Sequence, residues 1–180
     1  MVAKYVSALV LALLIEIPVI ESALAFPGER ELPESPPAHY ELVGEARLSV
    51  LWFDVYDASL LSNSGRYNPS SEPLLLKLSY LRDISRERLI KETQKQLRDQ
   101  LPEARLASAL EGLRAIWPDI EKGDRLAFWL APNGAGGFYH NGRFLGEMAD
   151  EQFNRAFIGI WLAEDSQYPK LAQALRGGSD

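Results

Sequence analysis

Hydrophobic and polar positions alternate along the chain from position 42, which is the period of a half-buried strand. Leu42 and Leu48 share one face, and the positions from Val50 to Phe53 are apolar on both faces. We predict one strand over 42–53 whose end enters the centre of a sheet. Three segments follow: a strand that continues the first or pairs with it, a loop, and a third strand (55–61, 62–73 and 74–81).

The pattern then changes to a helical period, and two helices are predicted. Ser85 is a candidate cap of the first helix, with Ile84 and Leu89 placed as a hydrophobic staple. Pro102 fits the start of the second helix, where its missing N–H costs nothing, and Pro118 marks the end. The apolar side chains of the second helix share one face: Leu106, Leu110, Leu113 and Trp117.

The strand period returns over 124–131 and again on both sides of Asn141-Gly142. Asn-Gly between two strand-like runs predicts a two-residue hairpin turn, because both turn residues take positive φ. Two helices close the chain, one capped by Asp150 and one over 169–175. Strands, a helix pair, a hairpin and final helices form an α+β order. We therefore expect a mostly antiparallel sheet with helices packed on one face.

The first 25 residues are typical of a secretory signal peptide. Lys4 precedes an apolar run, and Ala23-Leu24-Ala25 forms a small-x-small cleavage site. Glu16 and Pro18 argue against the alternative of an N-terminal core helix, and the run is shorter than the ~20 residues that span a bilayer. We predict an exported, periplasmic or secreted protein with a signal peptide, an extended lead-in and one globular domain (1–25, 26–39 and 40–180).

Composition narrows the classes of function. The apolar fraction of 47% and the charged fraction of 24% suit a globular protein. The net charge of −6 argues against a nucleic-acid partner, which requires a basic face. The chain has no cysteine and only two histidines, His39 and His140, which argues against a zinc site. No glycine-rich strand-to-helix loop occurs, so no nucleotide or other cofactor is expected. The sequence indicates no oligomeric state.

One stretch raises the question of catalysis. GGFYHNGRFLGEM, residues 136–148, holds a histidine, a tyrosine, an arginine and a glutamate. It contains no Ser, Cys or Thr nucleophile, and no carboxylate is indicated that would orient His140 as a base. We interpret the stretch as a hairpin with an exposed His140, and we assign no catalytic and no metal-binding residue.

Three pieces of the chain carry a family resemblance in their order and spacing: VYDASLL (55–61), GDRLAFWL (123–130) and FYHNGRFLGEMADEQFNRAFIGIWLAEDSQYPKLAQAL (138–175). Over residues 40–177 the chain resembles the bacterial chalcone isomerase-like proteins. The resemblance implies an open-faced β-sandwich with a ligand between the sheet and the helices. Plant relatives are either isomerases that close a flavonoid ring or non-catalytic fatty-acid-binding proteins. The latter hold a carboxylate with an arginine and a tyrosine.

The resemblance implies ligand-binding roles for Arg47 in GEARL and Tyr56 in VYDA. The catalytic tyrosine and asparagine of the isomerases fall on or beside Arg88 and Lys95, which supply neither a phenol nor a carboxamide. This departure argues against ring closure. The residues also have plainer interpretations. Arg47 can be a strand arginine on a solvated face and Tyr56 a core tyrosine, and Arg88 with Lys95 can form a solvated helix face.

Three functions stay open at this point. The first is a non-catalytic exported protein that binds a fatty acid or another small amphipathic carboxylate through Arg47 and Tyr56. The second is an isomerase or intramolecular lyase with an unidentified substrate. The third is a structural or partner-binding domain without a ligand. A cavity of roughly 300 Å³ or more beside Arg47 would favour the first.

Overall fold

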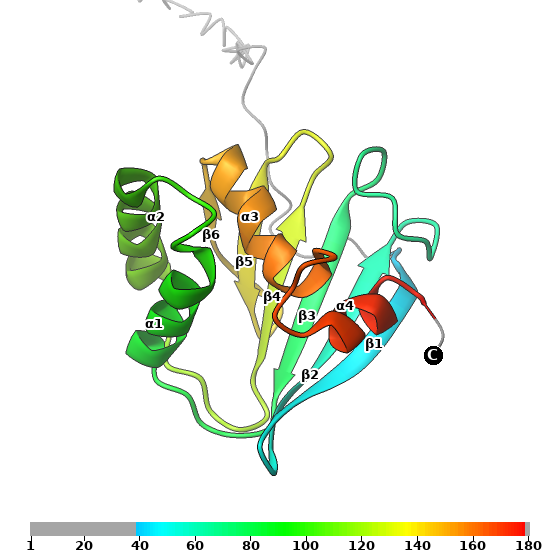
Figure 1. Ribbon diagram of the computed structural model, residues 1–180, viewed down its shortest axis with the longest axis horizontal. Helices are drawn as coiled ribbons and strands as arrows, with labels where there is room; N and C mark the ends of the chain where they lie inside the picture. Colours follow the sequence, from blue (N-terminus) through cyan, green and yellow to red (C-terminus); the bar gives the residue numbers. More distant parts are fainter. Residues whose placement is uncertain (1–38, 179–180) are drawn as a thin grey trace, which may run out of the picture. The chain divides into compact units, whose positions relative to one another are not determined.

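The computed structural model describes residues 39–178 (Figure 1). The predicted signal peptide, residues 1–25, and nearly all of the lead-in, residues 26–39, lie outside the described residues. Within 39–178, no helix is long and apolar enough to cross a bilayer.

Six strands form one antiparallel sheet in which every strand neighbours the strand before it in the chain. This order places β1 and β6 at the two edges, and β3 and β4 pair although two helices lie between them in the chain. The strands are β1 (Glu41–Val50), β2 (Phe53–Ser62), β3 (Leu74–Tyr80), β4 (Arg125–Leu130), β5 (Gly136–His140) and β6 (Arg143–Met148).

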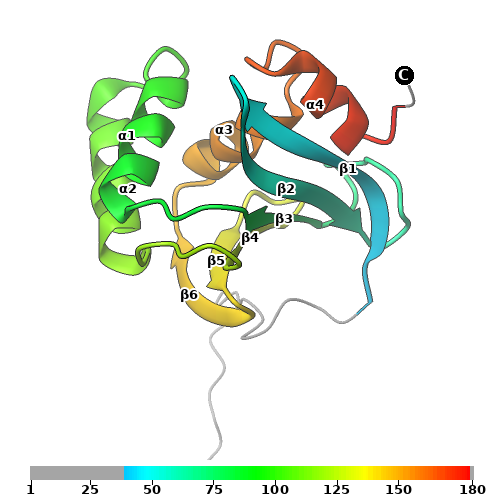
Figure 2. The same cartoon turned by 90° about the horizontal axis from the view of Figure 1, so that it is seen from below.

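Four helices lie on one face of this sheet and leave the other face open, as Figure 2 shows. The first two pack against each other, and the last packs on β1. The predicted α+β class with an open-faced, helix-covered antiparallel sheet is confirmed. The helices are α1 (Arg86–Leu97), α2 (Glu103–Ile116), α3 (Glu151–Leu162) and α4 (Pro169–Leu175).

Alternation along β2 divides its side chains between the two faces of the sheet. Tyr56, Ala58 and Leu60 are buried in the main core beneath the helices. Asp57 and Ser59 therefore point to the uncovered face, because successive strand residues point in opposite directions. A smaller cluster of Leu75, Ala127 and Tyr139 covers part of that open face.

The predicted helix caps and the second hairpin turn are confirmed. Ser85 caps α1, and Asp150 caps α3 by accepting bonds from the N–H groups of its first turn. Asn141 and Gly142 have φ values of 52° and 85°, so both turn residues adopt the positive φ that the sequence predicts.

The predicted strand over 42–53 is wrong at its end. Instead of entering the sheet centre, the chain turns at Leu51 and Trp52, and Val50 pairs with Phe53. The segment 55–61 belongs to β2, which pairs with β1 rather than continuing it. The turn contains no Gly, Asn, Asp or Pro, so no residue in it signals a turn.

Candidate functional site

Arg47 lies on the uncovered face of the sheet, opposite Asp57 on β2. Its guanidinium forms two bonds with the Asp57 carboxylate, at 2.6 and 2.9 Å, and a third with Asp54 at 3.0 Å. The side chain is 52% exposed. These carboxylates hold the pKa of Arg47 above its usual value. A ligand between the sheet and the helices therefore has no access to Arg47, which lies on a solvated strand face.

Tyr56 lies on the opposite face, in the core beneath the helices. Its hydroxyl accepts a hydrogen bond of 2.8 Å from the Trp161 indole N–H, and its ring meets Tyr80 edge-on at 5.7 Å. Burial raises the pKa of the Tyr56 hydroxyl. The structure does not bring Arg47 and Tyr56 together, so the two cannot share one carboxylate.

Arg88 and Lys95 are exposed on α1, as expected of a solvated helix face. The interpretation of His140 needs correction, because its Nε2 lies 3.0 Å from the Asp124 carboxylate and the side chain is only 23% exposed. Asn141 also donates to Asp124, and these bonds, with one from the Glu121 N–H, lower the pKa of Asp124 to about 2. A carboxylate does contact His140, and the arrangement braces the turn. Among residues 39–178, no group of acidic and histidine side chains could hold a metal ion.

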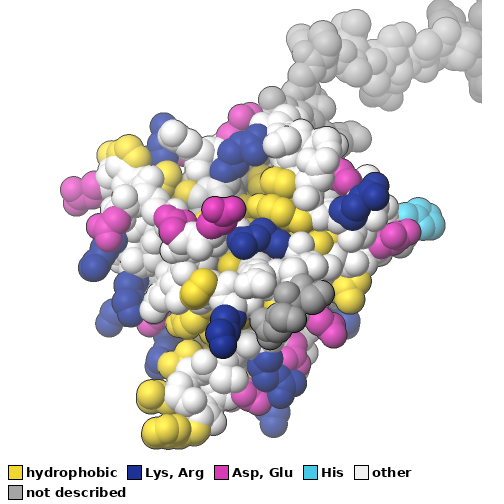
Figure 3. All heavy atoms as spheres, turned by 45° about the vertical axis from the view of Figure 1, so that its right-hand side comes forward, with side chains coloured by type: hydrophobic (Ala, Val, Ile, Leu, Met, Phe, Trp, Pro, Cys, Tyr) yellow, Lys and Arg dark blue, Asp and Glu magenta, His cyan; other side chains and the backbone are white. Residues whose placement is uncertain are grey.

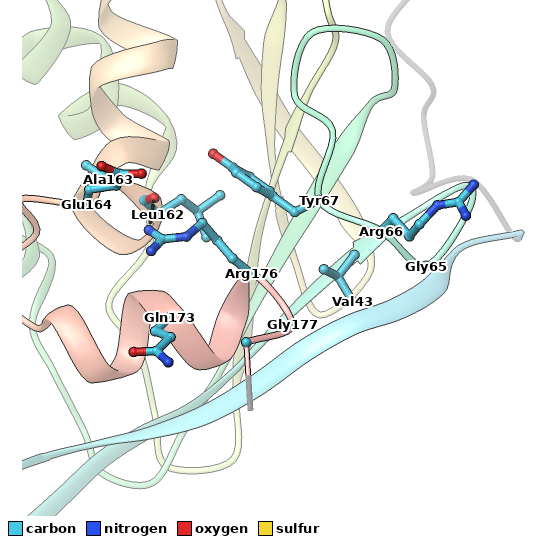
Figure 4. A pocket seen from close by; sticks show the side chains of 11 residues that line it. Val43, Gly65, Arg66, Tyr67, Leu162, Ala163, Glu164, Gln173, Arg176 and Gly177 are labelled. Atoms are coloured by element: carbon cyan, nitrogen blue, oxygen red, sulfur yellow. Dashed lines mark hydrogen bonds between the residues drawn. The ribbon is translucent and has the colours of Figure 1, made fainter. Parts of the chain in front are cut away.

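A cleft of about 800 Å³ opens elsewhere on the helix-covered side, beyond the C-terminal end of α3. Figure 4 shows that four separate segments line it: β1, the loop between β2 and β3, the end of α3 and the end of α4. Its lining includes apolar, cationic, anionic and phenolic side chains, among them Val43, Arg66, Tyr67, Leu162, Glu164 and Arg176.

Two glycines let α4 end where it does. A side chain at Gly44 would collide with the backbone carbonyls of Ala174 and Leu175, so only glycine lets α4 approach β1 this closely. Gly177 follows the helix with a φ of 80°, the left-handed conformation that commonly ends a helix. The close approach and the turn together place Arg176 at the rim of the cleft.

Arg176 and Tyr67 reach toward the same end of α3 (Figure 4). Arg176 donates a hydrogen bond of 2.7 Å to the Leu162 carbonyl, which fixes its orientation. Burial raises the pKa of the Tyr67 hydroxyl, while nearby Arg176 acts in the opposite direction and Glu164 raises it. The hydroxyl therefore keeps its proton at neutral pH and can donate a hydrogen bond.

Neither Arg66 nor Arg176 forms an ion pair with any acidic side chain of the described part of the chain. A guanidinium without an internal carboxylate is suited to an external one, because its planar fork matches the two oxygens. The apolar Val43 and Leu162 side chains line the same cleft. The cleft can thus hold an anionic head group beside Arg176 and an apolar tail beside Leu162.

No sequence signal marks this cleft. Arg176 precedes two glycines at the end of a helix, where a cation is usually explained by the helix dipole. Tyr67 lies in a segment that composition identifies only as a loop.

Comparisons with known proteins agree with this fold. A family model described as chalcone isomerase-like matches residues 36–177. An uncharacterized protein of Haemophilus influenzae is 34% identical over 147 residues, which are 79% of this chain and 71% of the relative. A solved structure of an Arabidopsis thaliana fatty-acid binding protein aligns with a TM-score of 0.61 and 12% identity, covering 81% of this chain and 91% of that chain. That identity shows a shared fold alone.

Proposed function

The chain belongs to the chalcone isomerase-like family, and on that premise we propose that it is a non-catalytic binding protein for a small amphipathic carboxylate such as a fatty acid. The observation that carries the proposal is the cleft of about 800 Å³ in which Arg176 and Tyr67 lie together above apolar side chains. Its volume lies within the ~300–1,000 Å³ of small-molecule sites. The fatty-acid binding protein with the same fold supports the class of ligand.

The site suits binding better than ring closure. Ring closure requires donors preorganised around developing charge on the substrate. The two family positions that would supply a phenol and a carboxamide fall on or beside Arg88 and Lys95, which are exposed on α1. The purified protein is therefore expected to convert chalcones no faster than the spontaneous reaction.

Calorimetric titration with dodecanoate below its micelle concentration tests the proposal. Saturable binding at one site per chain is expected, and methyl dodecanoate should bind more weakly because it lacks the charge. Arg176→Gln should weaken dodecanoate binding about ten- to a hundredfold, since a charge-assisted hydrogen bond contributes ~1.5–3 kcal/mol. Tyr67→Phe should have a smaller effect in the same direction.

Three further variants make the result specific. Arg66→Gln removes a cleft charge whose side chain makes no hydrogen bond within residues 39–178, so reduced affinity in this variant cannot come from lost folding. Arg47→Gln and Arg143→Gln remove charges outside the cleft and should bind dodecanoate as the unaltered protein does. Unchanged affinity in both the Arg66 and Arg176 variants, or no saturable binding at all, would contradict the proposal.

We also propose that the protein is exported and cleaved after Ala25. Lys4, the apolar run and the Ala-x-Ala site support this. Mass spectrometry of protein recovered from the periplasm or the medium should show a chain that begins at Phe26. An intact Met1 in that fraction would contradict export by cleavage.

A further inference from the structure

We propose that the tip of the β1–β2 hairpin, Val50–Phe53, docks into the interfacial layer of a lipid bilayer. The four side chains are consecutive and apolar, and their exposed fractions are 44%, 78%, 85% and 56%. Hydrophobic side chains gather at the lower end of the molecule in Figure 3, the end at which this hairpin turns in Figure 1. Such a cluster in a protein with a complete core marks an interaction surface.

The turn itself conflicts with local folding preferences. Leu51 has a φ of 58°, the left-handed region that costs ~1–2 kcal/mol for residues other than glycine. Trp52 is not in this region, so only the first turn position has positive φ, as in the turn type where glycine is preferred there. The chain thus places a large apolar side chain where folding alone favours glycine.

The base of the hairpin is braced, so the tip has a fixed direction. Arg47 bonds Asp57 and Asp54 across the two strands, and the Ser49 hydroxyl donates to Asp54 at 2.6 Å. The Arg82 guanidinium lies 5.5 Å from the centre of the Phe53 ring, on its face. Because these contacts hold the strands together below the tip, the apolar side chains point outward without collapsing onto the sheet.

The size and shape of the tip favour a lipid surface over a protein. The four side chains expose on the order of 500 Å², given ~150–250 Å² for an aromatic residue, less than the ~800 Å² per partner of a stable protein interface. A hairpin end is convex, so it fits a fluid layer that deforms around it. Trp52 is the most exposed of the four, and tryptophan is enriched at membrane interfaces because its ring is apolar and its N–H is polar.

The charges around the tip indicate which lipid it requires. Arg47 and Arg82 are balanced by Asp54 and Asp57, so the tip region offers no net positive charge to anionic head groups. We therefore expect docking to neutral phosphatidylcholine, driven by apolar insertion. The cleft lies near Val43, seven residues along β1 from Val50 and ~23 Å away at ~3.3 Å per residue. Docking and ligand binding can therefore be tested separately.

Flotation with phosphatidylcholine vesicles tests the docking. The full chain should float with the vesicles, and the double variant Leu51→Ala/Trp52→Ala should partition at least about tenfold less. Leu42→Ala is a matched control, because Leu42 is 52% exposed on the same strand at the end far from the tip. It should float as the unaltered chain does, and the double variant should still bind dodecanoate.

Tryptophan fluorescence distinguishes docking of the tip from a loss of folding. Trp117 and Trp161 are buried, and Trp129 is held by Tyr40. A blue shift on adding vesicles should therefore arise from Trp52. Trp52→Phe keeps an apolar tip, so it should still float but show no blue shift.

Several results would overturn the proposal. They are no flotation, equal flotation of the double variant, or flotation that needs anionic lipid and disappears in salt. Protection of Trp52 from acrylamide without vesicles would mean that another part of the chain or a second copy covers the tip. A dimer that the double variant abolishes would likewise assign the tip to a second copy.

Discussion

The β1–β2 and β5–β6 hairpins both turn over two residues, but the residues at the two turns differ in chemistry. Asn141 and Gly142 both adopt positive φ and are polar or small. Leu51 adopts positive φ without a residue type that favours it, and Trp52 beside it is 85% exposed. The β5–β6 turn has the residues that folding prefers, and the β1–β2 turn keeps apolar residues at a cost in stability.

The two turns also differ in how they are attached to the rest of the protein. The Asn141 side chain donates to Asp124 and accepts from the Arg125 N–H, which ties the β5–β6 turn to the start of β4. At the far end of that hairpin, buried Asn154 donates to the Met148 carbonyl. The β1–β2 hairpin is instead braced beside its turn, by Arg47 with its two carboxylates, by Ser49, and by Arg82 against the Phe53 ring. Residues that weaken folding at an exposed tip support the proposed contact of this tip with a bilayer.

The largest expected effect is at the turn that folding prefers. Gly142→Val should lower the free energy of unfolding by about 2 kcal/mol, because a β-branched residue resists a φ of 85°. A Cβ at Gly142 would meet no atom within 4 Å, so the loss is conformational and not steric. Urea unfolding measures the change, and Gly142→Asn should lose less because asparagine tolerates positive φ. Equal losses in the two variants would contradict this explanation.

The stabilisation of the β5–β6 turn by the Asp124 carboxylate should depend on pH. The pKa of Asp124 is about 2, below the ordinary ~3.9 of an aspartate. Its contribution is therefore complete above ~pH 4 and is lost as the pH falls toward 2. Asp124→Asn should be less stable than the unaltered protein at pH 7 by about 1.5 kcal/mol, and the difference should shrink toward pH 2.

The control for this prediction is His140→Ala, which should change stability at pH 7 by less than about 0.5 kcal/mol. Urea unfolding at pH 7, 4 and 2 measures both variants. A difference between Asp124→Asn and the unaltered protein that stays constant with pH would assign the brace to something other than the carboxylate.

The smallest effect on the free energy of unfolding is expected at the β1–β2 turn, where the substitution should stabilise the protein instead of destabilising it. Leu51→Gly should raise the free energy of unfolding by about 1 kcal/mol, because glycine adopts a φ of 58° without strain. Leu51→Ala removes the apolar side chain but keeps the Cβ, so it should bring no such gain. If both variants stabilise the protein equally, exposure of the leucine and not its backbone conformation is the cause.

The two hairpins also show how far the sequence predicts this fold. The Asn141-Gly142 pair predicts its turn, because both residue types favour positive φ. Val50 to Phe53 reads as a buried strand, because apolar positions on both faces are usual only inside a sheet. The helix caps at Ser85 and Asp150 were predictable because capping depends on local residue types.

The candidate site was harder to predict because it depends on strand register and on distant segments. Once the turn falls at Leu51 and Trp52, Arg47 faces Asp57 and Leu48 faces Tyr56. Arg47 and Tyr56 then lie on opposite faces, which a single strand over 42–53 could not reveal. The cleft around Arg176 joins four segments of the chain, so no local pattern contains it.

We propose that a carboxylate ligand lies beside Arg176 and not beside Arg47. Amide chemical-shift mapping with dodecanoate tests it most directly, because one titration reports every described backbone N–H. The largest shifts are expected at Tyr67, Glu164 and Gly177, with little change at Glu45, Arg47 and Asp57. Shifts that cluster on the uncovered face around Arg47, or no shifts at saturating dodecanoate, would contradict it.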